Sequence, residues 1–308
     1  MINVSNLRKS FHTVEALRGI SFNIQQGECY GLLGPNGAGK TTTISILSGI
    51  LPTDGGELRI NGHDLKKDPL TCKSQIGVVP QEIGFYHELS AFDNLLFWGS
   101  LYQVPKRQLM RRIDAMMDLL GLAERKNDKV KAYSGGMKRR VNIASALLHN
   151  PQVLLMDEPT VGIDPQSRNL IFEVVERLRD DGMTVIYTTH YLEEAERLCD
   201  RIGIIDNGEI ITQGTLAALK ASHSVEESVV ISFAHVSDEQ ESAITREWKN
   251  FQRIDDCIHF HSMDIQSDLA AIILMCNRAG LHIEHIDMRK MNLEFLFLNL
   301  TGKQLRDP

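Results

Sequence analysis

The sequence lacks paired cysteines, long apolar runs and an excess of positive charge. Its five cysteines are scattered along 308 residues without a Cys-x-x-Cys pair. This excludes a disulfide framework and a zinc site made of neighbouring residues, and it fits a reducing cytosol. No apolar run approaches the ~18 residues that a membrane-spanning helix needs, and the N-terminus lacks the charged and apolar regions of a signal peptide. We therefore expect a chain that does not span a membrane alone.

The charge balance and composition indicate an ordinary globular protein. The net charge is −7, because 40 acidic residues outnumber 33 basic ones. An acidic surface argues against nucleic-acid binding driven by bulk charge, so no nucleic-acid partner is expected. Hydrophobic residues make up 43% of the chain, which is typical of a packed core. The length allows one large domain, or a large domain and a small one.

The first 222 residues have the hydrophobic pattern of an α/β domain. Buried strands are predicted for the apolar runs at residues 30–33, 77–79, 153–156 and 185–188. Helical patterns separate these runs, which indicates a mainly parallel sheet. Antiparallel strands are predicted at residues 20–24, at 58–60, and in a hairpin at 202–212 that turns at Asn207-Gly208. Residues 90–133 carry helical patterning without a clear strand, so we expect an inserted helical subdomain there.

Residues 223–308 have the pattern of a separate, small α+β domain. Strands are predicted at 229–233, 251–254, 257–260 and 283–288, and helices at 239–249 and 266–278. This β-α-β-β-α-β order is typical of the ferredoxin-like fold. A last helix is predicted at 293–300.

Four histidines in this small domain raise the question of a metal site. His259 and His261 alternate on one strand and share a face, and His282 and His285 lie near another strand. In a ferredoxin-like sheet these two strands would not be neighbours, and no cysteine pair supports the site. We therefore favour a surface or packing role over metal binding.

A glycine-rich loop after the strand at 30–33 matches G-x-x-x-x-G-K-[ST], a phosphate-binding pattern. The loop and the start of the next helix comprise Gly34, Pro35, Asn36, Gly37, Ala38, Gly39, Lys40, Thr41 and Thr42. Glycines let consecutive backbone N–H groups turn toward an anion, and the helix directs its positive end at it. We expect these residues to bind ATP, with Lys40 at the β- and γ-phosphates and Thr41 as a ligand of Mg²⁺.

Two acidic residues end the apolar strand at 153–156. Asp157 lies at the carboxyl end of the strand, where ligands of open α/β sheets bind, and it can hold Mg²⁺. Glu158 follows and is placed to act as the general base on the attacking water. The alternative is an acidic turn into Pro159, and the phosphate loop in the same chain makes that alternative the minor one.

The segment Tyr133-Ser134-Gly135-Gly136-Met137 resembles the signature motif of ABC ATPases. Ser134 is a natural N-cap, and the two glycines expose backbone N–H groups at a helix start, which is an anion-binding arrangement. The resemblance implies that Ser134, Gly135 and Gly136 bind the nucleotide held by a second ATP-binding subunit, which we expect to be an identical copy. The alternative is a capped helix without a ligand.

Further motifs follow in the order found in this family. By resemblance, Gln81 senses Mg²⁺ and the attacking water, Asp164 lies in the D-loop, His190 contacts the γ-phosphate, and Phe11 stacks on adenine. Each residue has a plainer alternative: Asp164 before Pro165 as an N-cap, Gln81 as a loop amide, Phe11 as a core residue, and His190 as one of eleven histidines. The joint order and spacing of the motifs favour the functional interpretation.

The resemblance covers roughly residues 1–220 and implies a fold and a function. The fold is a P-loop NTPase of the ABC type, with an antiparallel β-subdomain and an inserted helical subdomain. The function is ATP hydrolysis coupled to transport through a separate integral membrane permease subunit, at the cytoplasmic face of the cell membrane. Met137 and Tyr133 replace the commoner glutamine and leucine, and with the C-terminal residues 293–297 they resemble the ABC-2 exporter branch.

Two other functions remain as alternatives. A soluble ABC ATPase acting in DNA repair, chromosome organisation or translation would carry a long coiled coil between Lys40 and Ser134, or a second ATPase domain, and the sequence has neither. A nucleotide-binding regulator without turnover is disfavoured because Glu158, His190 and Gln81 are all present.

Residues 81–92 carry many apolar groups for a loop region. We expect Phe85, Tyr86 and Leu89 to line a groove that receives a helix of the membrane subunit. The alternative is that these side chains pack the helical subdomain onto the sheet.

Overall fold

The computed structural model describes residues 1–308 except 83, 223–226, 263–264, 290–292, 294–296 and 298–308. Its contacts divide the chain into two compact units, with the division between Leu216 and Ala217. The division lies at the start of helix α8 (Leu216–Ser222), after its first residue, whereas the sequence interpretation set it after residue 222. Among the described residues, no helix is both long and apolar enough to cross a bilayer.

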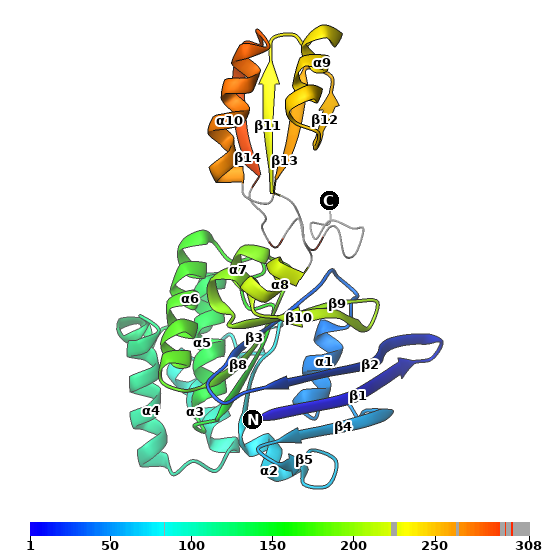
Figure 1. Ribbon diagram of the computed structural model, residues 1–308. Helices are drawn as coiled ribbons and strands as arrows, with labels where there is room; N and C mark the ends of the chain where they lie inside the picture. The colour runs from blue at the N-terminus through cyan, green and yellow to red at the C-terminus, as the bar shows by residue number, and fades with distance from the viewer. Residues whose placement is uncertain (83, 223–226, 263–264, 290–292, 294–296, 298–308) are drawn as a thin grey trace. The chain divides into compact units, whose positions relative to one another are not determined.

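A six-stranded sheet forms the centre of the first unit (Figure 1). Its order is β10 (Glu209–Gly214), β9 (Arg201–Asp206), β3 (Cys29–Leu33), β8 (Thr184–Thr189), β7 (Val153–Asp157), β6 (Ile76–Val79). All neighbours are parallel except the β9–β10 hairpin, as predicted. Because parallel strands end at a common edge, the residues that follow β3, β7, β8 and β6 are brought together there.

The central sheet is buried on both faces, so alternate residues of one strand enter different cores. Leu154 and Met156 of β7 pack with the helices α5 (Gly135–Leu147) and α6 (Pro165–Asp180), whereas Val153 and Leu155 pack with α1 (Lys40–Leu47) and a second sheet. That sheet is antiparallel, in the order β2 (Val14–Ile24), β1 (Ile2–Phe11), β4 (Gly55–Ile60), β5 (His63–Asp64). Helix α2 (Pro69–Ser74) leads from it into β6.

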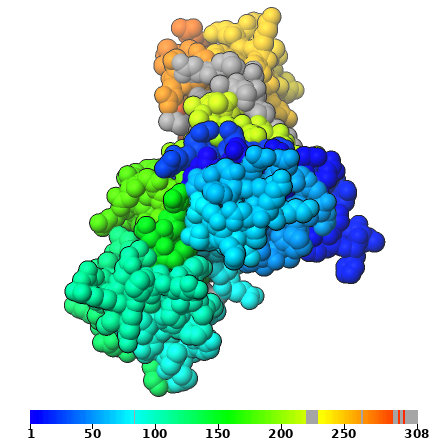
Figure 2. Space-filling view, turned by 90° about the horizontal axis from the view of Figure 1, so that it is seen from below, coloured from blue at the N-terminus to red at the C-terminus, as the bar shows by residue number. Residues whose placement is uncertain are grey.

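Helices fill the segment in which the sequence predicts a helical subdomain. They are α3 (Ala91–Leu101), α4 (Lys106–Leu119) and the short 3₁₀ turns η1 (Ala123–Arg125) and η2 (Val130–Ala132). The α4 residues Leu109, Ile113 and Met117 are buried on one face, at the spacing of an amphipathic helix. Figure 2 shows these helices, in teal, as a lobe beside the blue β-rich part of the same unit. Helices α5 (Gly135–Leu147), α6 (Pro165–Asp180) and α7 (Leu192–Leu198) complete the unit.

The second unit has the predicted ferredoxin-like topology. Its elements are β11 (Glu227–Phe233), α9 (Asp238–Glu247), β12 (Phe251–Ile254), β13 (Cys257–Ser262), α10 (Ile265–Arg278) and β14 (Ile283–Arg289). The sheet order β12-β13-β11-β14 is antiparallel throughout, which is the split β-α-β arrangement. Val229, Ile231, Ile258 and Phe260 form its core with α9 and α10. The helix predicted at 293–300 lies, apart from two positions, outside the described residues.

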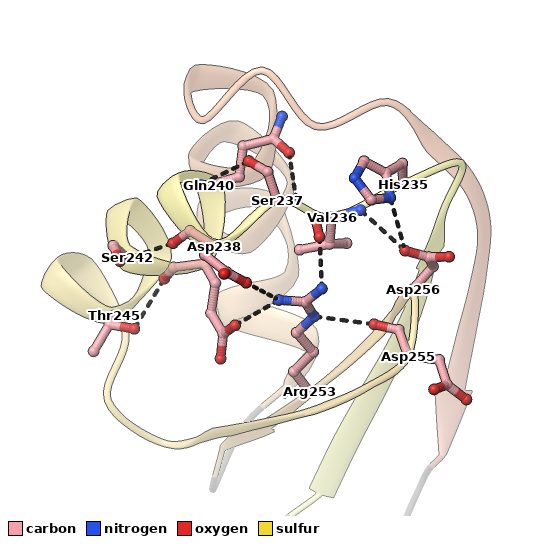
Figure 3. Close-up of polar contacts among 11 residues, drawn as sticks. His235, Val236, Ser237, Asp238, Gln240, Ser242, Thr245, Arg253, Asp255 and Asp256 are labelled. Atoms are coloured by element: carbon pink, nitrogen blue, oxygen red, sulfur yellow. Dashed lines mark hydrogen bonds and ion pairs between the residues drawn. The ribbon is translucent and has the colours of Figure 1, made fainter.

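An arginine ties the β12–β13 hairpin to the start of α9 (Figure 3). Arg253 donates to Glu241 Oε2 at 2.7 Å and to the carbonyls of Val236 and Asp255 at 2.6 and 3.0 Å. Its hydrogen bond with Glu241 raises the pKa of the guanidinium. Because these acceptors belong to the same unit, we assign the cluster to folding.

The histidines of β13 and β14 lie on strands that are not neighbours in the sheet. His259 and His261 lie on β13 and His285 on β14, and β11 runs between the two strands. In the part of the chain that the structure describes, no three His, Cys, Asp or Glu side chains are grouped to hold a metal ion.

Candidate functional site

The glycine-rich loop leads from β3 into α1 as predicted. Gly39 forms the N-cap of α1 with φ of 109°, a left-handed conformation that favours glycine. It offers no side-chain cap, so the first-turn N–H groups point outward without a capping oxygen. A helix start of this kind suits an anionic ligand such as a phosphate. Thr41 is exposed and Thr42 half-buried in that first turn.

Lys40 lies across this loop and is almost fully buried. Its Nζ atom donates to the carbonyls of Gly34 and Pro35 at 2.7 and 3.0 Å and lies 3.0 Å from Glu158 Oε1. The ammonium group is only 4% exposed. A buried cation at the mouth of a loop of N–H donors fits a polyphosphate, which would replace the carbonyl contacts.

The acidic pair at the end of β7 is positioned by its neighbour β8. The hydroxyl of Thr188 donates to Asp157 Oδ1 at 2.7 Å and accepts from the backbone N–H of Glu158 at 3.0 Å. Glu158 has φ of 45°, an uncommon conformation for a residue other than glycine. This backbone geometry accompanies a side chain that lies beside Lys40 and 3.4 Å from His190 Nδ1.

These contacts bring together four residues singled out in the sequence: Lys40, Asp157, Glu158 and His190. The two carboxylates are 3% and 6% exposed, and His190 Nδ1 is buried without a hydrogen bond of good geometry. Buried carboxylates need a cation or a proton partner. The residues present therefore fit a divalent metal ion together with ATP.

The backbone of Gln81 is held by a residue that the sequence interpretation missed. Arg139 of α5 donates to the carbonyls of Pro80 and Gln81 at 2.6 and 2.7 Å, while the Gln81 side chain is exposed. The only available signal was an arginine on the buried side of the signature helix, and a basic run after a helix start is normally read as a solvated face.

The signature motif begins α5. Ser134 is its N-cap and accepts from the Met137 N–H at 3.2 Å, as predicted. A Cβ atom added to Gly136 would lie 2.1 Å from Ser167 Oγ, so the packing of α6 explains this glycine. A Cβ atom added to Gly135 would have no neighbour closer than 3.9 Å, to Ile163. The packing within this subunit therefore does not require glycine at 135.

Asp164 and Phe11 each had a structural role as the alternative to nucleotide binding. Asp164 caps α6 and accepts from the Ser167 N–H at 2.9 Å, which confirms the N-cap interpretation. Hydrogen bonds with Ser167 lower the pKa of Asp164. Phe11 is 42% exposed at the end of β1, with Lys9 Nζ 5.5 Å from its ring centre, so it is not a core residue.

The expected groove of three side chains is wrong for Phe85, which is buried in the core. Asn94 causes this, because its amide bonds both the N–H and the carbonyl of Tyr86 and holds the loop close to α3. Tyr86 and Leu89 are exposed, and Phe97 of α3 makes an edge-to-face contact with Tyr86 at 5.2 Å. The exposed apolar surface is therefore formed by Tyr86, Leu89 and Phe97.

Comparisons with known proteins identify the family of the chain. Residues 17–161 match the model of the ABC transporter family. The linearmycin resistance ATP-binding protein LnrL of Bacillus subtilis is 43% identical over the full length of both chains. The Nod factor export ATP-binding protein I of Ralstonia nicotianae is 34% identical over 100% of this chain and 95% of the relative.

Solved structures support the same assignment for the first unit. The ATP-binding subunit of an ABC transporter matches with a TM-score of 0.66 and 30% identity, over 72% of this chain and 93% of that chain. A dimeric cassette, MJ0796 bound to ADP and Pi in a post-hydrolysis state, matches with a TM-score of 0.64 and 28% identity, over 70% and 99%.

The fold and the site thus define a P-loop ATPase of the ABC type. The chain belongs to the ABC transporter family, in which it is an ATP-binding subunit that hydrolyses ATP. The soluble, non-transport alternative is not favoured, because the relatives are named for export or drug resistance.

Proposed function

We propose that this subunit powers export of a small natural product, such as an antibiotic, through a separate membrane permease. The observation that carries the proposal is the cluster of Lys40, Glu158 and His190 at the phosphate loop. The names of relatives similar over the whole chain, for linearmycin resistance and Nod factor export, support the direction of transport and the class of cargo.

The residues of the cluster have distinct tasks in this mechanism. Glu158 accepts the proton of the attacking water, and His190 holds the γ-phosphate in line. Lys40 releases its contacts with Gly34 and Pro35 and neutralises charge on the phosphoryl group. Thr41, Asp157 and Gln81 would hold Mg²⁺, which supplies further positive charge to the phosphoryl oxygens.

Each ATP is shared between two copies of the chain. The phosphate loop of one copy binds it from one side, and Ser134, Gly135 and Gly136 of the other copy bind it from the opposite side, with Asp164 at the junction. The open space at Gly135 supports this arrangement, because a ligand held by another subunit needs room there. Phe11, exposed at the end of β1, stacks on the adenine.

The permease binds to the apolar surface of Tyr86, Leu89 and Phe97. These side chains are 52%, 41% and 38% exposed. Exposed aromatic and aliphatic anchors of this kind receive an amphipathic helix of a partner. The subunit then resides at the cytoplasmic face of the membrane as a peripheral protein.

The test is reconstitution of this subunit with its permease in lipid vesicles. Hydrolysis that increases when a candidate antibiotic is added, together with ATP-dependent movement of that compound, is the expected result. The same complex with Lys40→Ala should do neither. Hydrolysis without movement of any compound would contradict export, and ATP binding without hydrolysis would favour a regulator.

A further inference from the structure

Helix α5 contacts the loop of Gln81 through its buried flank. Arg139 bridges two consecutive carbonyls, of Pro80 and Gln81, at 2.6 and 2.7 Å. Asn142, three positions further on the same face, donates to the Pro80 carbonyl at 3.2 Å. Three donors of one helix thus hold the backbone at the point where β6 ends.

Burying the charge of Arg139 costs more free energy than a contact with only a structural role requires. Arg139 is 4% exposed, and its Nε atom is buried without a partner. Burial lowers the pKa of this arginine, and the proximity of Tyr187 and Asp157 opposes that shift. An apolar side chain of similar volume would fill the site without burying a charge. The arginine therefore provides a geometry that an apolar residue does not, the bridging of two adjacent carbonyls.

The same helix carries the signature motif at its start. Ser134 and Gly135 precede Arg139 by five and four positions, so about 6–8 Å of rigid helix separates them along the axis. The helix therefore has two separate contact points. Its start is open at Gly135, and its flank binds the backbone of Gln81 through Arg139.

We propose that Arg139 is a positioning residue that couples the two nucleotide sites of the dimer. This rests on the proposed function, in which Gln81 serves the nucleotide of its own subunit and Ser134 serves that of the partner. A nucleotide that moves Gln81 also moves α5, because Arg139 joins them, and α5 then meets the second nucleotide in a different position. Binding at one site thereby changes affinity at the other.

Arg140 supplies a matched control for this inference. It follows Arg139 in the same helix, is 9% exposed, and also has a buried Nε atom without a partner. Burial lowers its pKa in the same way. Its guanidinium, however, donates to the carbonyl of Leu120 at 2.8 Å and not to the Gln81 loop.

The experiment measures ATP hydrolysis by the full chain against ATP concentration, with melting temperature as the measure of folding. The wild type should give a Hill coefficient above 1, up to about 2 for two coupled sites. Arg139→Met should lower the coefficient to about 1, whereas Arg140→Met should keep the wild-type coefficient at whatever rate it retains. Arg139→Lys retains the charge but lacks the planar fork that aligns two donors with two adjacent carbonyls, so it should give an intermediate value and serves if the methionine variant does not fold.

The outcomes distinguish the coupling role of Arg139 from the proposed function of the subunit. A wild type that hydrolyses ATP without cooperativity, or equal coefficients in the wild type and the Arg139 variants, would overturn the coupling role and leave the ATPase assignment intact. An equal loss in the Arg139 and Arg140 variants would also overturn it, because it would mark a general effect of disturbing α5. A wild type without hydrolysis would refute the proposed function itself.

Discussion

At the scale of single residues, the unusual backbone of Glu158 and its contacts with Lys40 and His190 make it the residue most open to test. Glu158→Gln keeps the shape of the side chain but cannot accept a proton. We expect turnover to fall by about 10²–10⁴-fold, the usual contribution of a general base, with ATP binding retained. Hydrolysis and nucleotide binding by the purified variant are the measurements.

Glu176→Gln is a suitable control for that substitution, because Glu176 forms a surface ion pair with Arg197 at 2.8 Å. Such pairs contribute about 0–1 kcal/mol, so near-normal turnover is expected. If Glu158→Gln were as active as this control, another residue would have to be the base.

A half-buried histidine makes the stability of the first unit depend on pH. His149 stacks on Tyr102 at 3.9 Å, and its Nε2 atom lies 2.9 Å from the Ile76 carbonyl. Burial lowers the pKa of His149, so its folded-state value lies below the unfolded value of about 6.5. The stability that the neutral form of His149 contributes is therefore fully present above pH ~6.5. It is lost as the pH falls through the folded-state pKa of His149.

We expect the melting temperature of the wild type to decrease between pH 7 and 5 more steeply than that of His149→Gln. Glutamine removes the titrating ring and can still donate to the Ile76 carbonyl. Carboxylates with lowered pKa values, such as Asp54 and Asp164, act only at more acidic pH. Parallel pH profiles of the two proteins would show that His149 has no part in the dependence.

At the scale of elements, the start of α5 contains two glycines, and each has a different physical reason to be glycine. Gly136→Ala forces a Cβ atom against Ser167, and overpacking of this kind costs about 1–3 kcal/mol of unfolding free energy. Gly135→Ala has open space within the subunit, so its stability should be close to that of the wild type. Its ATPase activity should nevertheless fall, because the added methyl group meets the partner's nucleotide.

Chemical denaturation and ATPase assays on the two variants separate these effects, with each variant serving as the control of the other. A fully active Gly135→Ala protein would show that no ligand approaches this position.

The elements show which features a sequence can predict. The strands β3, β7 and β8 are buried at every position, and continuous apolar runs of that kind are visible without a structure. The caps Ser134 and Asp164 are local and follow from residue type.

Long-range contacts were beyond prediction. Phe85 is buried because Asn94, nine residues later, fixes the loop, and Arg139 lies 58 positions from the carbonyl of Gln81 that it binds. In each case a side chain binds a particular backbone N–H or C=O group, and these groups are nearly the same at every residue, so no pattern in the sequence marks the choice.

At the scale of the whole molecule, shared sites predict complementation between inactive chains. Ser134→Arg disrupts the cap of α5, and Lys40→Ala removes the cation of the phosphate loop. Each chain alone should be inactive. A mixture should regain part of the ATPase activity, because a mixed dimer contains one intact site and one site with both defects.

The mixing experiment needs a control heterodimer in which both substitutions are in the same chain and the partner is wild type, and both heterodimers must be purified away from homodimers. In the control heterodimer each of the two sites has one defect, so its activity should be lower than that of the first heterodimer. Higher activity in the control heterodimer would mean that the phosphate loop and the signature motif do not act across subunits.

The pairing of β11 with β14 has a consequence for how such proteins change over time. Ser228 lies opposite Arg289, so the chain enters and leaves the ferredoxin-like fold at adjacent positions. An insertion or deletion of the whole fold between these points would leave the flanking chain to be rejoined by a short turn. The whole fold can thus be removed or exchanged as one segment, because its two ends lie side by side.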